Sequence, residues 1–164
     1  MIGFFPNTYP DELFYSLCAR YSDRVQYRNK ENVNFELFGD RSYSASIELP
    51  FHLDFFVANL PHGHQLSINR IIDDHTLLPI YAPFISTERV KSIRERMCTS
   101  NGQGIQNSTG STYTRLRPLT WLRFCPLCIL EDKRQFGECY WHRTHQVLGV
   151  EVCPWSEPLN ETGS

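Results

Sequence analysis

Apolar residues recur at helical spacing through the first hundred positions of the chain. Leu13, Leu17 and Tyr21 share one face of a helix that we expect over residues 10–24. Its first turn, residues 10–12, holds a proline and two acids, which suit the positive end of a helix dipole. This segment therefore predicts an amphipathic helix whose apolar face packs against a core.

The same spacing predicts four further helices, over residues 29–38, 52–60, 67–74 and 87–97. Ser67 and Ser86 are suitable N-caps for the last two. The helices at 52–60 and 67–74 flank a tight turn, an arrangement typical of a helix-turn-helix. Many helical domains contain this arrangement, so it does not by itself indicate DNA binding. The proline-rich residues 75–84 predict no helix.

A polar segment divides the chain. Residues 99–112 are rich in Ser, Thr, Asn and Gly and almost uncharged, which predicts a flexible connection. Residues 113–123 alternate bulky and basic side chains, which favours an extended strand. We therefore predict a mainly α fold with a helical body over residues 1–98, a flexible connection over 99–116 and a small module over 117–164.

The small module contains cysteines at the spacing of metal ligands. Cys125 and Cys128 form a C-P-x-C pair, and Cys153 precedes a second proline. Such a pair can bind one tetrahedral zinc ion, and a segment this short needs a metal to fold. We predict a zinc knuckle with a structural Zn²⁺. A redox C-x-x-C, a catalytic zinc and metal-free thiols are alternatives, but no thioredoxin-like βαβ pattern, H-x-E or H-E-x-x-H signature accompanies the cysteines.

A tetrahedral site needs a fourth ligand, and a C-P-x-H ending is absent because position 156 is Ser156. Cys139 is the first candidate, because thiolate is a far better zinc ligand than a serine hydroxyl. His142 and His145, three positions apart on one helical face, are the alternatives. Both histidines can instead belong to a packed, hydrogen-bonded hinge, and a site with three ligands or none stays open.

Composition and charge narrow the class of protein. The chain is 41% hydrophobic, as folded proteins are, and contains no run of about 18 apolar residues and no signal-peptide pattern. We expect a cytoplasmic, nucleoid-associated protein without a membrane partner, whose cysteines stay reduced.

The formal net charge of −2 is unevenly distributed. Residues 1–84 carry six basic and ten acidic side chains, whereas residues 85–148 carry ten and five. A local basic face can bind phosphates although the sum is negative. We expect the acidic body to bind a protein partner. The residues that we expect to contact double-stranded DNA are Arg115, Arg117, Arg123, Lys133, Arg134 and Arg143.

Three stretches of the chain resemble the TniQ family, in the same order and over nearly the whole length. They read FPNTYPDELFYSLCARY, HTLLPIYAPFIS and LRFCPLCILEDKRQFGECYWHRTHQVLGVEVCP. The nearest resemblance is to the TnsD-like members found in cut-and-paste transposons, whose N-terminal TniQ domain this chain resembles. The family's zinc motif is C-P-x-C followed by C-P-x-H, so Ser156 stands where the family has histidine.

The resemblance implies a function without catalysis. TniQ proteins are DNA-binding target-site selectors that recognise an insertion site or couple to an RNA-guided complex. They recruit an AAA+ ATPase regulator, which in turn engages the transposase. The alternative is a protein-interaction adaptor that docks on the ATPase or the guide complex without reading DNA itself. A metalloenzyme is a more distant alternative.

Overall fold

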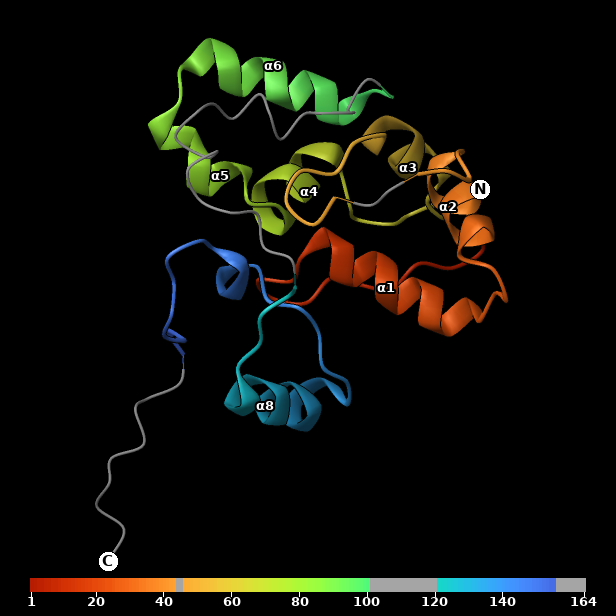
Figure 1. The fold of residues 1–164 in the computed structure, drawn as a ribbon. Helices are drawn as coiled ribbons and strands as arrows, with labels where there is room; N and C mark the ends of the chain where they lie inside the picture. The colour runs from red at the N-terminus through yellow and green to blue at the C-terminus, as the bar shows by residue number, and fades with distance from the viewer. Residues whose placement is uncertain (44–45, 101–120, 156–164) are drawn as a thin grey trace, which may run out of the picture.

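The computed structural model describes residues 1–43, 46–100 and 121–155 of the chain, and these ranges are mainly helical, as predicted. They contain α-helices and short 3-10 turns and no β-strand. The elements in order are α1 (Phe14–Val25), α2 (Lys30–Phe38), α3 (Leu53–Asn59), α4 (Ile68–His75), α5 (Leu78–Tyr81), η1 (Ala82–Phe84), α6 (Thr87–Cys98), α8 (Pro126–Phe136) and η3 (Thr144–Gln146). Figure 1 shows α1 between α3, α4 and α6 on one side and α8 on the other.

Helix α1 begins at Phe14, so the prediction of a first turn at residues 10–12 is wrong. Asp11 has a left-handed φ of 53°, and Glu12 forms an antiparallel bridge with His142. The carboxylates of these two acids pair with Arg143 and Arg20, so they are bound in tertiary contacts and not at the start of the helix. The apolar face of α1 is buried as expected, with Leu17 fully enclosed.

The core takes side chains from α1 to α6, and its part between α1, α2 and α3 is rich in aromatic rings. Phe56 of α3 is fully buried, and its ring meets those of Phe14 and Phe5 edge to face at centroid distances of 4.9 and 5.1 Å. Helix α2 is capped at its start by the Asn29 side chain, which accepts a hydrogen bond from the Glu31 amide at 3.2 Å. Gly39 ends it with a φ of 72°.

Helices α3 and α4 lie where the sequence predicts the two helices of a helix-turn-helix, and residues 60–67 connect them. Ser67 and Ser86 cap α4 and α6 as predicted, each accepting from an amide three residues later. The proline-rich residues 75–84 differ from the prediction, because α5 and η1 are short helices there. Each has proline in its first turn, where the missing N–H costs no intrahelical bond.

The predicted flexible connection lies largely outside the described residues, as does most of the strand predicted over 113–123; its described part, residues 121–123, forms no strand. Helix α8 begins at Pro126 and is capped at its C-terminal end by Gly137, which has a φ of 77°. No helix within the described ranges has the length and apolar character needed to cross a membrane.

Candidate metal centre

The first turn of α8 positions two of the predicted ligands. Cys125 occupies the N-cap, and Pro126 starts the helix, so that Cys128 projects from the first turn. The Sγ atoms of Cys128 and Cys153 lie 3.4 Å apart, and the three sulfurs of Cys125, Cys128 and Cys153 all lie within 4.8 Å of one another. These three residues, hereafter the cysteine cluster, can hold a metal ion. The structure thus brings together the three cysteines that the sequence singles out.

The three remaining ligand candidates lie differently. His145, in η3, is buried, and its Nε2 is 3.3 Å from Sγ of Cys153 and 3.8 Å from Sγ of Cys128. His142 is also buried, but its Nε2 is 2.9 Å from the Asp132 carboxylate. The Cys139 side chain is exposed and is not among the residues that gather at the cysteine cluster.

Two polar side chains hold the backbone segments that carry the cysteine cluster. The Gln146 amide is fully buried; it accepts from the Arg123 amide N–H at 2.9 Å and donates to the Arg123 carbonyl at 2.7 Å. The Arg123 guanidinium donates to the carbonyls of Val147 and Val150. The segment before Cys125 and the loop before Cys153 are therefore tied together through direct hydrogen bonds. Sequence reasoning missed Gln146, because a lone glutamine carries no local signal.

The environment of the cysteine cluster disfavours charged sulfurs unless a cation is present. Burial raises the pKa of the Cys128 thiol, and the neighbouring Cys153 and Cys125 sulfurs raise it further. Metal coordination requires thiolates, so a bound cation would displace the protons and supply the compensating charge. This arrangement is suited to metal binding more than to a free reactive thiol.

The segment that carries the cysteine cluster is docked on α1 and on the residues before it. The Leu13 amide donates to the Trp141 carbonyl at 2.9 Å, and the Arg143 amide donates to the Asp11 carbonyl at 2.7 Å. Arg143 Nε also lies 3.2 Å from the Asp11 carboxylate. Backbone and side-chain bonds therefore join residues from opposite ends of the described chain.

The residues expected to contact DNA divide into three groups. Arg115 and Arg117 lie outside the described residues. Arg123 and Arg143 bind backbone carbonyls within the fold, so these side chains hold the structure in place. Lys133 and Arg134 are exposed on α8, where Arg134 pairs with Glu131 on the same helix.

The α4 surface of the helix-turn-helix candidate carries both signs of charge. Arg70 lies 3.7 Å from Asp74, and Asp73 accepts from Arg94 of α6 at 2.6 Å. Two carboxylates on the outer face would repel phosphates. A DNA-reading role for this pair of helices stays a prediction.

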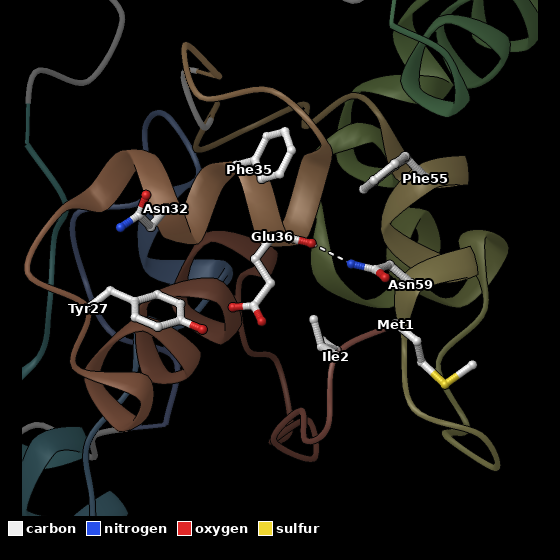
Figure 2. A pocket seen from close by; sticks show the side chains of 8 residues that line it. All are labelled: Met1, Ile2, Tyr27, Asn32, Phe35, Glu36, Phe55 and Asn59. Carbon is white, nitrogen blue, oxygen red and sulfur yellow. Dashed lines mark hydrogen bonds between the residues drawn. The ribbon is translucent and has the colours of Figure 1, made fainter.

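A groove lies between α2 and α3, away from the cysteine cluster. Sequence reasoning missed this groove. The groove, of about 570 Å³ and hereafter the α2–α3 groove, is lined by Met1, Ile2, Tyr27, Asn32, Phe35, Glu36, Phe55 and Asn59. In Figure 2, the Phe35 and Phe55 rings stand on its two sides, and the Glu36 carboxylate points into it near Tyr27. Met1, Tyr27, Phe35 and Phe55 are all exposed.

The helical fold and the cysteine cluster define a mainly helical protein whose C-terminal segment carries three cysteines that can hold a metal ion. The model of the TniQ family matches residues 3–155, so the chain belongs to the TniQ family. The chain is also 29% identical over 151 residues to the "Transposon Tn7 transposition protein TnsD" of Escherichia coli. That match covers 92% of this chain and 30% of the relative, so the chain spans less than a third of the relative's length.

Proposed function

We propose that this chain is a non-catalytic target-site selection protein of a transposon that binds double-stranded DNA and recruits an AAA+ ATPase regulator to the insertion site. The observation that carries the proposal is the TniQ match over nearly the whole chain, together with the similarity to a transposition protein. The relative is more than three times as long, so further segments of such a protein can add DNA contacts of their own. The regulator would in turn engage the transposase, and an RNA-guided complex would couple to this chain itself.

We propose that the metal held by the cysteine cluster is zinc in a structural role. Three thiolates are soft donors of the kind that structural zinc sites use, and this segment has little apolar core of its own. Bound zinc would fix the start of α8 against the loop that carries Cys153. The exposed face of α8, with Lys133 and Arg134, would then present its charges in a fixed orientation.

The DNA part of the proposal rests on charge at exposed positions of α8, together with Arg115 and Arg117. The test measures binding to target and random duplexes at several salt concentrations, for the wild type and for a Lys133→Glu/Arg134→Glu variant. Each lost phosphate contact reduces the slope of log K against log salt by about 0.9. The matched control is Lys30→Glu on α2, away from α8. An unchanged affinity and slope in the α8 variant would refute DNA binding through this face.

The α2–α3 groove favours recruitment of a protein partner. Tyr21 donates to the Glu36 carboxylate at 2.7 Å, and the negative charge of this carboxylate raises the pKa of Tyr27. Within the described ranges, Glu36 forms no ion pair. Arg41 already lies over the Phe35 ring at 5.1 Å, so the aromatic wall accepts a cation. The groove suits a segment of the ATPase regulator that presents a lysine or arginine between apolar side chains.

Binding of the purified ATPase regulator tests this recruiting face. Phe35→Ala and Glu36→Gln should each weaken binding, because one removes apolar contact area and the other removes the charge. Phe84→Ala is the control, since Phe84 is equally a large exposed ring but belongs to η1. If the groove variants bind as the wild type does, the regulator docks elsewhere. If they alter only the sedimentation of the chain alone, the groove is an interface between copies.

The groove also supports the alternative function, an adaptor that docks on the regulator without reading DNA. The two functions differ in the salt titration. An adaptor would bind the regulator through the α2–α3 groove and would show the same weak affinity for target and random duplexes.

A further inference from the structure

We infer that His145 is the fourth ligand of the metal centre, through Nε2, and that it takes the place of the histidine that this chain lacks at Ser156. The inference rests on the proposed zinc site at the cysteine cluster. The family motif would place this ligand at position 156, and a ranking by donor softness would choose Cys139. Neither criterion identifies His145. The assignment of His145 rests on the geometry of two sulfurs and one ring nitrogen.

Two sulfur distances from His145, those to Cys128 and Cys153, are close to the edges of a tetrahedral metal site, whereas His145 is not in the group of ligand atoms that lie within 4.8 Å of one another. With Zn–S bonds of about 2.3 Å and Zn–N bonds of about 2.05 Å at tetrahedral angles, S···N edges are roughly 3.6 Å and S···S edges roughly 3.8 Å. The two observed Nε2···Sγ distances, 3.3 Å to Cys153 and 3.8 Å to Cys128, lie on either side of the expected edge. The Cys128–Cys153 sulfur separation of 3.4 Å is slightly shorter than its edge. One ion can therefore reach these three donors with small shifts.

The fold holds His145 in this position. The residue lies in η3 and is followed by Gln146, whose buried amide is fixed by three hydrogen bonds to the backbones of Arg123 and His142. The Trp155 ring packs near the imidazole at a centroid distance of 5.8 Å. The imidazole therefore has little freedom to leave the cysteine cluster, and a preorganised ligand raises metal affinity.

The other two candidates for the fourth ligand, His142 and Cys139, do not lie against the sulfurs in this way. His142 directs Nε2 to the Asp132 carboxylate, and its described contacts include no sulfur of the cysteine cluster. Cys139 is exposed, and the described sulfur contacts of the cysteine cluster reach His145 but not Cys139. With His145 the donor set is three sulfurs and one nitrogen, which is the composition of a C-P-x-C plus C-P-x-H site. The same metal chemistry is thus reached from a different position in the chain.

Spectroscopy of the Co²⁺-substituted protein, with zinc competition for affinity, tests this assignment. The wild type should show the absorption of a tetrahedral site with three sulfurs and one nitrogen. X-ray absorption of the Zn²⁺ form should show one imidazole in the first shell. His145→Cys should convert the spectrum to that of four sulfurs, and this variant keeps a ligand in place if His145→Asn fails to fold.

The matched controls are His142→Asn and Cys139→Ser. Both should keep the wild-type spectrum, whereas His145→Asn should lower zinc affinity by at least about 100-fold, because even outer-shell changes cost about 10–100-fold. A wild-type spectrum in His145→Cys, or its loss in Cys139→Ser, would overturn the role of His145 and leave the metal centre standing. A wild-type chain that binds neither Co²⁺ nor Zn²⁺ would instead overturn the proposed zinc site itself.

Discussion

Arg20 of α1 donates hydrogen bonds at 3.0 and 2.9 Å to the carboxylate of Glu138, although 118 positions separate the two residues. Its Nη1 also lies 2.9 Å from the Glu12 carboxylate, which is 0% exposed. The Tyr9 ring covers the guanidinium at 3.8 Å. One buried cation therefore joins the N-terminal residues, α1 and the segment after α8. This contact fixes the segment that carries the cysteine cluster relative to the helical body.

Replacing this cation should destabilise the fold strongly. Arg20→Met leaves the Glu12 carboxylate buried without its counter-charge, which typically costs about 3–5 kcal/mol of unfolding free energy. Arg24→Met is the control, because Arg24 also binds Glu138 but is more exposed; its loss should cost under about 1 kcal/mol. Urea unfolding followed by circular dichroism measures both. Equal losses would contradict a central role for Arg20.

The hydrogen bonds around Glu138 predict that the stability of the fold depends on pH. Burial alone would raise the pKa of Glu138, but hydrogen bonds from Arg24, Tyr9 and Arg20 outweigh it and lower the pKa to about 2. The unfolded value is about 4.3, so the contribution of Glu138 is fully present above that pH and is lost as pH falls toward 2. Glu138→Gln should therefore be less stable than the wild type at pH 7, by about 1–2 kcal/mol.

The difference between Glu138→Gln and the wild type should shrink steadily between about pH 4.3 and 2. Measuring this difference separates Glu138 from other groups that titrate in the same range. Glu95→Gln, at an exposed position of α6, is the control and should follow the wild type at every pH. A difference that does not change with pH would mean that the charge of Glu138 does not stabilise the fold.

The helices could be predicted where local signals define them. Asn29, Ser67 and Ser86 supply caps whose side-chain oxygens bond the first turn, so α2, α4 and α6 begin where the sequence predicts. The start of α1 could not be predicted in this way. Glu12 reads as a residue of the first turn, but its carboxylate binds Arg20 in a buried pair. Local propensity cannot anticipate a partner that tertiary packing supplies.

The cysteine cluster illustrates the same limit within one site. The C-P-x-C spacing and the later Cys153 predict three residues that do gather in space. Ranking the fourth ligand by donor softness favours Cys139, whereas burial and distance favour His145. A sequence shows which side chains can bind a metal, but not which of them the backbone brings to it.

The glycine that ends α2 provides a further test of the α2–α3 groove. Gly39 has a φ of 72°, and a Cβ there would lie 2.9 Å from the Phe55 ring. Gly39→Ala should lose roughly 1–2 kcal/mol to left-handed strain, and the exposed ring should turn aside and alter the α2–α3 groove. Gly63→Ala is the control, with a φ of 83° and open space around the Cβ. Both variants should lose similar stability, but only Gly39→Ala should weaken binding of the ATPase regulator.

Arg123 is expected to support the metal centre, because its guanidinium binds the carbonyls of Val147 and Val150 in the loop before Cys153. Arg123→Gln should lower zinc affinity by about 10–100-fold, as outer-shell changes do, and competition with a chelator measures this loss. Lys133→Gln removes a charge from the exposed face of α8. It should leave zinc affinity unchanged while reducing the salt dependence of DNA binding. If Arg123→Gln keeps full zinc affinity and loses only DNA binding, Arg123 is a phosphate contact and the loop before Cys153 holds its shape without it.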